Sequence, residues 1–346
     1  MTPEEKKKYL VMPAFQTLII IIVSIVISVA VYKASSKFLF EETRPELLNL
    51  NPTELTRNFG EIQTPIDVGL YLNNFSNFDM VKGEFTFSGV IWFKFDPAAI
   101  SLETIGNFSF DKGEILEKSA PYTQIVDNKL FARYNIKVKF ASALKYSRFP
   151  IDNHSIFIVL DNKFLYPNDA FFRAGKKDFI IKPDMRHIGW NQLDTSVDAG
   201  ITKLVLEEFD KKTDVYNLRT VFKINYLRTD TKYFITIFIP LIMIFFLSLF
   251  TFSLDPDQYS AGSSLGLATG GVTGIIAFKF VIESMSPQVG YFMLSDYLYF
   301  LFFIAIMLIF FFYLVLYRLK LNSTYIVLAL QTFVLLSTVY FLLWGI

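Results

Sequence analysis

The stretch Gly262–Gly266 reads Gly-Ser-Ser-Leu-Gly and matches the G-x-S-x-G nucleophile elbow, in which Ser264 would be the nucleophile. An elbow exposes its serine on a turn between a strand and a helix, whereas this stretch lies inside an apolar run, so we interpret the match as fortuitous. His154 and His187 are the two histidines of the chain, and neither has a partner at metal-ligand spacing. Because no phosphate-binding loop or dinucleotide fingerprint is present either, the sequence predicts no enzyme, no cofactor and no metal site.

A different pattern in the same region is more informative. Between Tyr259 and Tyr291, glycines recur every four residues and therefore follow one face of a helix; they are Gly262, Gly266, Gly270 and Gly274. Several serines and threonines lie among them, and Lys279 lies in the outer third of the stretch. Polar groups in hydrocarbon are costly and usually turn toward protein or water. We expect this helix to pack tightly against other helices, to line a water-filled path, or both.

The composition indicates a membrane protein, because 53% of the 346 residues are hydrophobic and 39 of them are phenylalanine. Stretches of about 20 apolar residues, enough to span a bilayer, are Val11–Tyr32, Tyr233–Leu254, Ala261–Ile282, Leu294–Tyr317 and Tyr325–Trp344. The sequence thus divides into residues 1–36, a cytoplasmic tip and transmembrane anchor; residues 37–232, an outer domain; and residues 233–346, a four-helix transmembrane domain.

The basic residues set the expected orientation. Lys6, Lys7 and Lys8 precede the first span and place the N-terminus in the cytoplasm by the positive-inside rule, with the polar domain and the C-terminus outside an inner (plasma) membrane. A cleaved signal peptide is the alternative for the first span, and its length favours a retained anchor. The net charge of +1 suggests no nucleic-acid partner, and the absence of cysteine excludes disulfides and thiol chemistry.

Period-two alternation predicts strands in the outer domain. It is clearest over residues 84–95 and 130–140, with further candidates at Ser155–Leu160, Phe179–Ile181, Lys203–Leu206 and Thr220–Leu227. Strands this frequent suggest an antiparallel β-sandwich. The last strand runs directly into the second span, which predicts mechanical coupling between the outer domain and the membrane helices.

This order of parts resembles a subunit of the pentameric ligand-gated ion channels, the Cys-loop superfamily in its prokaryotic form. The motifs that carry the resemblance are Asp67–Asp79 as the first inner-sheet strand and its loop, Tyr146–Asn153 as the signature loop, Ile188–Trp190 as a late Gly-Trp step, Arg228 twelve residues before Pro240, and Pro287 with Tyr291 as the loop between the second and third channel helices. The resemblance extends from about residue 62 to the C-terminus. The chain departs from the family by lacking the signature-loop cysteines and by carrying an additional N-terminal anchor.

The resemblance implies a homo-oligomer, a pentamer in contact with membrane lipid, that passes monovalent ions and responds to a small-molecule ligand or to protons. It implies a buried ion pair between Asp152 and Arg228 at the junction of the domains, with Asp79 nearby. Pro150 and Pro287 would take part in the same coupling. The residues that would border the ligand pocket are Trp92, Tyr166 and Tyr216, and an aromatic face there could hold a cationic ligand.

Aligned on Pro287, the pore-lining stripe becomes Gly262, Gly266, Gly270, Thr273, Ala277, Phe280 and Glu283. The bulky apolar gate that the family places near mid-helix is Thr273 here, and the stripe offers a hydrophobic constriction only near Phe280. A register slip of one residue would instead bring Val272 or Ile276 inward. Alternatively, the glycines allow such close helix approach that no open path exists.

Acidic residues at both ends of this helix favour cations. Glu283 would form a ring at the outer mouth and Asp255 and Asp257 would lie near the inner one, whereas Lys279 would oppose cations if it faced the lumen. The alternative function is a non-conducting membrane receptor or assembly scaffold that keeps the channel fold. A transporter is less favoured, because no inverted repeat or pair of broken helices is present.

Overall fold

The computed structural model describes residues 40–48, 57–60, 63–208, 211–252, 261–319 and 323–343, with isolated residues between 18 and 33. They belong to two compact units. The sheet unit comprises Phe40–Lys145 and Asn153–Thr229, and the helical unit contains Tyr146–Asp152 together with the helices that follow Asp230. The expected N-terminal anchor, residues 11–32, falls largely outside the described residues.

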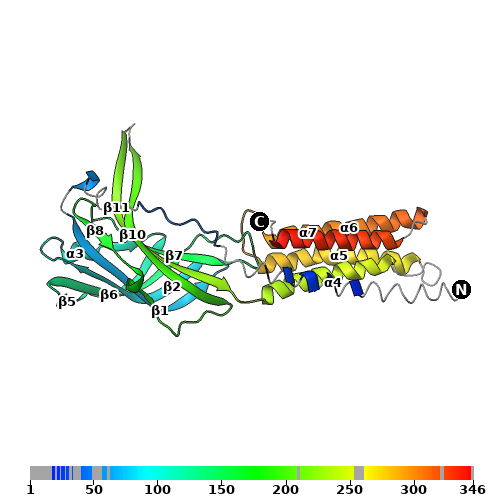
Figure 1. The fold of residues 1–346 in the computed structure, drawn as a ribbon, viewed down its shortest axis with the longest axis horizontal. Helices are drawn as coiled ribbons and strands as arrows, with labels where there is room; N and C mark the ends of the chain where they lie inside the picture. The colour runs from blue at the N-terminus through cyan, green and yellow to red at the C-terminus, as the bar shows by residue number, and fades with distance from the viewer. Residues whose placement is uncertain are drawn as a thin grey trace. The chain divides into compact units, whose positions relative to one another are not determined.

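The sheet unit is built from two sheets (Figure 1). Its elements are β1 (Thr64–Asp79), β2 (Glu84–Phe95), α3 (Leu102–Gly106), β3 (Phe108–Phe110), β4 (Gly113–Lys118), β5 (Tyr122–Val126), β6 (Lys129–Ala141), β7 (His154–Asn162), β8 (Ala170–Arg173), η1 (Lys176–Asp178), β9 (Phe179–Ile181), β10 (Trp190–Glu208) and β11 (Lys211–Arg228). The seven-stranded sheet has the order β4-β6-β2-β1-β8, with β5 beside β6 and β9 beside β1. The four-stranded sheet has the order β10-β11-β7-β3.

The two clearest expected strands are present. β2 buries Phe85, Phe87, Ile91, Phe93 and Phe95 on one face, and β6 buries its alternate residues in the same way. The two strands pair antiparallel along their whole length. β10 and β11 are much longer than the segments 203–206 and 220–227 expected from the sequence. Outside those segments polar and apolar residues are mixed on both faces of each strand, so the alternation that predicts a strand is absent there.

The expectation of a purely antiparallel sandwich is wrong in one place. β1 pairs parallel with β8 and with β9, whereas its pairing with β2 is antiparallel. A parallel pair requires a crossover between its strands rather than a tight hairpin. β8 and β9 follow β7, which belongs to the four-stranded sheet. The chain therefore returns to the seven-stranded sheet after β7 and joins β1 on the edge away from β2.

Aromatic rings fill the space between the two sheets. The ring of Phe179 on β9 lies 5.2 Å from that of Phe222 on β11, and Phe78 at the end of β1 lies 5.1 Å from Tyr226. Rings at such distances in edge-on or tilted contact add to the stabilisation from area burial. The single buried cluster that they join takes residues from both sheets, so the unit is sandwich-like.

Among its described residues, the helical unit has four helices that are long and apolar enough to cross a bilayer, which indicates a multi-pass membrane protein. They are α4 (Lys232–Leu249, continued by η2, Phe250–Phe252), α5 (Ala261–Met285), α6 (Leu294–Leu319) and α7 (Ser323–Leu343). Each overlaps an expected span. α5 ends shortly before Pro287, as expected because proline disfavours helical geometry in the residue that precedes it.

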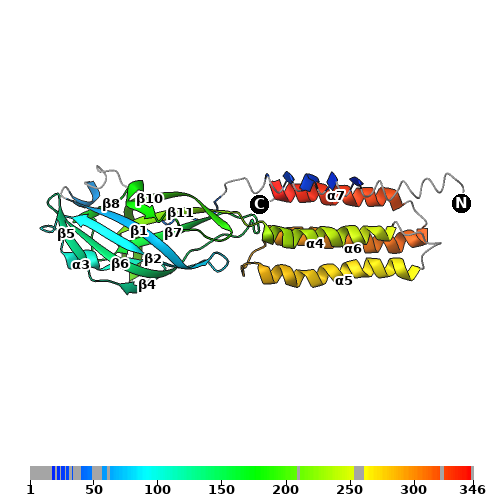
Figure 2. The ribbon, with the colours of Figure 1, turned by 90° about the horizontal axis from the view of Figure 1, so that it is seen from below.

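The four helices run alongside one another (Figure 2). α5 packs against α4 and α6, α4 also packs against α6, and α6 packs against α7. Figure 2 shows α5 and α7 on opposite sides of the bundle. Only 17% of the residues in the apolar window of α5 are buried, against 44%, 39% and 33% in α4, α6 and α7. α5 is therefore the helix that leaves the most surface for something outside this chain.

Candidate functional site

α5 has two distinct faces. Its buried residues are Ser264, Ala268, Gly271, Ile275 and Ile282, which contact the rest of the bundle. The expected pore-lining residues Gly262, Gly266, Gly270, Thr273, Ala277 and Phe280 are all exposed. Because successive helical residues turn by about 100°, these six share one face, opposite the buried one. Within one chain, nothing among the described residues covers that face.

Glu283, the seventh expected residue, lies off this line. From Gly266 to Glu283 the helix advances 17 residues, which turns Glu283 about 100° away from the glycine face. Ser284 is exposed and continues the face instead. The side chain of Glu283 is more than half exposed and lies on the same side of α5 as Lys279, one turn away.

The glycines of α5 serve two different purposes. A Cβ atom added at Gly271 would lie 2.0 Å from Ser248 Oγ on α4, so this glycine permits close contact between the two helices. A Cβ atom at Gly266 or Gly270 would meet nothing within 4 Å. Packing inside the chain explains Gly271 but not the glycines of the exposed face, which leaves those available for water, lipid or another copy of the chain.

The polar residues of α5 are partly satisfied within the helix. Thr269 Oγ1 donates to the carbonyl oxygens of Leu265 at 2.9 Å and Gly266 at 3.1 Å. Such bonding one turn back lowers the cost of a hydroxyl in an apolar environment. Thr269 therefore gives less support to a water-filled path than its polarity alone suggests.

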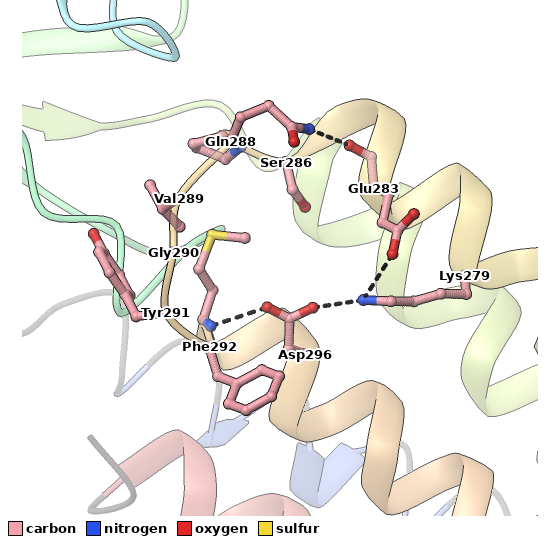
Figure 3. A pocket seen from close by; sticks show the side chains of 11 residues that line it. Lys279, Glu283, Ser286, Gln288, Val289, Gly290, Tyr291, Phe292 and Asp296 are labelled. Carbon is pink, nitrogen blue, oxygen red and sulfur yellow. Dashed lines mark hydrogen bonds and ion pairs between the residues drawn. The ribbon is translucent and has the colours of Figure 1, made fainter.

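The C-terminal end of α5 forms a charged cluster with the start of α6 (Figure 3). Lys279 Nζ lies 2.7 Å from Asp296 Oδ1 on α6 and 3.6 Å from Glu283 Oε1. Asp296 Oδ2 also accepts a hydrogen bond of 3.0 Å from the backbone amide of Met293, at the N-terminus of α6. These side chains line a cavity of about 450 Å³ with the loop from Ser286 to Phe292. Lys279 is thus directed toward α6 rather than along the exposed glycine face.

The segment Tyr146–Asp152, the expected signature loop, packs against the same end of the helical unit. The amides of Leu294 and Ser295 donate to the carbonyl oxygens of Ser147 at 2.7 Å and Phe149 at 3.1 Å. The first amides of a helix have no partner within it, so the loop satisfies two such donors of α6. Tyr291 Oη accepts from the amide of Tyr146 at 2.8 Å, which fixes the loop between α5 and α6 to the same segment.

The expected coupling residues are distributed over both units. Pro150, which follows a cis peptide bond, and Asp152 are buried in the helical unit, as is Pro287. Arg228 ends β11 in the sheet unit, where its guanidinium lies 4.4 Å from the centre of the Trp190 ring. The expected pairing of Asp152 with Arg228 stays a prediction.

Asp79 has a local role in the turn between β1 and β2. Its Oδ1 atom accepts from the amides of Val81 and Lys82, each at 3.0 Å. A short acidic side chain that binds amides two and three residues ahead stabilises a turn. Any coupling function of Asp79 would be additional to that role.

The three expected ligand-binding aromatics lie on separate elements. Trp92 on β2 covers Gly69 on β1, where an added Cβ would lie 2.2 Å from Trp92 Cε2. Tyr216 on β11 contacts the Phe59 ring edge-on at 5.2 Å, and Tyr166 is exposed between β7 and β8. In the described part of one chain, the three rings make no contact with one another. A pocket formed by all three rings stays a prediction.

Two acidic residues with specific partners in the structure were not predicted from the sequence. Asp296 is the acidic residue in the first turn of α6, and its position at a helix N-terminus was a usable signal. Glu42 lies 112 residues before its partner His154, and nothing in the sequence links the two.

No protein-family model matches the sequence, and no curated protein is significantly similar to it. The fold therefore defines the class directly: a multi-pass membrane protein with a sandwich-like sheet domain followed by four apolar helices. That architecture is compatible with the pentameric ligand-gated channel fold.

Proposed function

We propose that this chain is one subunit of a homopentameric, cation-preferring ion channel of the ligand-gated type, in an inner membrane with its sheet unit outside. The observation that carries the proposal is the exposed face of α5 that runs from Gly262 to Phe280, called the free face below. It is made of small and polar residues, with Phe280 the exception, and it lies opposite the face that packs on α4 and α6. Five such faces around an axis would enclose a path for monovalent ions.

The sheet unit would receive the signal. A small-molecule ligand or protons would act on it, and the direct continuation of β11 into α4 would carry the change to the helices. The expected pairs and loops at the junction, with Asp152, Arg228 and the two prolines Pro150 and Pro287, are proposed to transmit it. The role is transport rather than catalysis.

The second candidate is a non-conducting receptor or scaffold with the same fold. It is favoured by the open space over Gly266 and Gly270, where nothing lies within 4 Å of an added Cβ. Glycines at this spacing let two helices approach closely, so neighbouring copies of α5 could close the path completely.

Reconstitution in planar bilayers distinguishes the two. The purified protein is first crosslinked to count its subunits, and current is then recorded under a potassium chloride gradient while pH is varied and amines are perfused. A pentamer with discrete currents that reverse near the potassium potential supports the channel. A pentamer that is silent under all conditions supports the scaffold, and a monomer or dimer contradicts the pentameric channel.

A further inference from the structure

Lys279 places a positive charge near the outer end of α5, where it would oppose cation passage through the proposed channel. Its ammonium group lies 2.7 Å from Asp296 and 3.6 Å from Glu283 (Figure 3). On a third side it lies 5.2 Å from the centre of the Tyr299 ring. Two of these partners, Asp296 and Tyr299, belong to α6. The contacts with α6 draw the ammonium away from the free face of α5.

Asp296 is suited to hold this charge because it is itself fixed. Its side chain is only 11% exposed, and its second carboxylate oxygen accepts from the amide of Met293 at 3.0 Å. One oxygen binds the start of its own helix and the other binds Lys279, so the carboxylate cannot turn without losing a hydrogen bond. Glu283, by contrast, is 56% exposed and reaches Lys279 only at 3.6 Å.

The charges sum to a net negative cluster. Lys279 contributes one positive charge, and Glu283 and Asp296 contribute one negative charge each, which leaves one negative charge per chain at this end of α5. With Lys279 bound to Asp296, the unbalanced charge is that of the exposed Glu283. Without Asp296, Lys279 is free to neutralise Glu283, and the net charge is zero.

We propose that Asp296 is the positioning residue that sets ion selectivity: it holds Lys279 against α6 and thereby leaves the exposed Glu283, which lies beside the lining face and not on it, as the unbalanced charge at the mouth of the path. This inference rests on the proposed channel function and adds to it a residue that does not lie on the pore-lining face. Asp296 acts through Lys279 and need not contact the ion.

The decisive variant is Asp296→Asn, because asparagine can still accept from the Met293 amide but carries no charge to hold Lys279. We expect the potassium-to-chloride permeability ratio, taken from the reversal potential, to fall by about threefold to tenfold. The reason is that the positive charge of Lys279 then neutralises Glu283 at the mouth of the path in each subunit. Asp296→Glu restores the charge and is expected to restore most of the ratio. Glu283→Gln is expected to lower the ratio as Asp296→Asn does.

The double variant Lys279→Gln with Asp296→Asn tests the same point without an ammonium that has lost its carboxylate partner on α6, and is expected to assemble even where Asp296→Asn does not. It keeps Glu283 as the unbalanced charge, so its permeability ratio should remain close to that of the wild type. A double variant whose ratio falls as far as that of Asp296→Asn would overturn the proposal, because selectivity would then depend on Asp296 directly.

A second readout does not use conduction. A water-soluble amine-acylating reagent should modify Lys279 slowly in the wild type and several times faster in Asp296→Asn, as measured by mass spectrometry of the peptide. If the wild type conducts and Asp296→Asn changes neither selectivity nor labelling, this inference alone fails. If the wild-type pentamer carries no current, the proposed channel fails and this inference falls with it.

Discussion

His154 Nδ1 lies 2.6 Å from Glu42 Oε1 inside the sheet unit, and the exposed fractions of the two side chains are 0% and 1%. The second carboxylate oxygen of Glu42 accepts from the amide of Ser155 at 2.9 Å. The segment that carries Glu42 also forms bridges through Phe40 to Asn153 and through Leu48 to Ile201. Glu42 therefore anchors the stretch 40–48 to the sheet unit from within.

Glu42→Ala should destabilise the sheet unit strongly. Breaking a buried polar pair by removing one partner costs about 3–5 kcal/mol when charge is involved. Denaturant unfolding of the full-length protein in detergent can be followed by tryptophan fluorescence, because the ring of Trp190 lies 5.4 Å from that of His154. Arg44→Ala is the matched control, since its pair with Asp198 is at the surface and contributes about 0–1 kcal/mol. Equal losses in the two variants would contradict a dominant role for the buried pair.

His187 should make stability depend on pH in the acid range. Its ring stacks on Phe78 at 3.8 Å and is edge-on to Phe75 and Tyr226, and burial lowers its pKa from 6.5 to about 4. The unfolded chain therefore binds a proton more readily than the folded one between these two values, so stability is full above pH 6.5 and is lost as the pH falls toward 4.

The variant His187→Phe removes the titrating group and keeps an aromatic ring in the stack. Its unfolding midpoint should change less between pH 6.5 and 4 than that of the wild type. The contribution of His187 to the change in the free energy of unfolding over this pH range is at most about 3 kcal/mol, and solvent at the partly exposed ring reduces it. Two parallel pH profiles would show that another group carries the acid sensitivity.

Gly271→Ala and the adjacent Gly270→Ala should have opposite effects on the helical unit. The methyl group at position 271 would lie 2.0 Å from Ser248 Oγ and 3.1 Å from Ser248 Cβ, whereas position 270 is open. Overpacking of this kind costs about 1–3 kcal/mol, and alanine in place of an exposed helical glycine gains about 0.5–1 kcal/mol. Thermal unfolding in detergent measures both. A Gly270→Ala variant as unstable as Gly271→Ala would contradict the assignment of the two faces.

Cysteine substitution should report whether the free face of α5 meets water. The chain contains no cysteine, so each introduced thiol is the only one present. In reconstituted protein, a water-soluble methanethiosulfonate should modify Thr273→Cys and Ala277→Cys but not Ile275→Cys, which is fully buried in the bundle. Protection of all three would place Thr273 and Ala277 against lipid or protein and favour the scaffold.

The sequence predicted those elements whose patterns are strong and local. The four helices follow from apolar runs of sufficient length, and β2 and β6 follow from their unbroken alternation. Six of the seven residues expected to line a pore, from Gly262 to Phe280, are exposed on one face of α5, whereas Glu283 lies off it. Their role in a pore stays a prediction, because it depends on neighbours that one chain does not supply.

Other features depend on contacts between distant residues. The parallel pairing of β1 with β8 and β9 depends on where the chain crosses between sheets, and strand patterns do not encode that path. The repeat of glycines is evident in the sequence. That Gly271 packs against α4, unlike the exposed glycines, follows only from the position of Ser248 beside it. The orientation of Lys279 likewise required Asp296, which lies 17 residues further along the chain and on another helix.

The loop Tyr146–Asp152 has a consequence for how the protein is synthesised. It is translated before any residue of α4 to α7, yet it belongs to their unit, and Tyr146 reaches Tyr291 across 145 positions of the chain. The amides of Leu294 and Ser295 therefore obtain their partners from a segment that left the ribosome long before. A chimaera that exchanges only residues 230–346 would pair α6 with a loop from the other parent, so the exchanged piece should include residues 146–152 from the same parent.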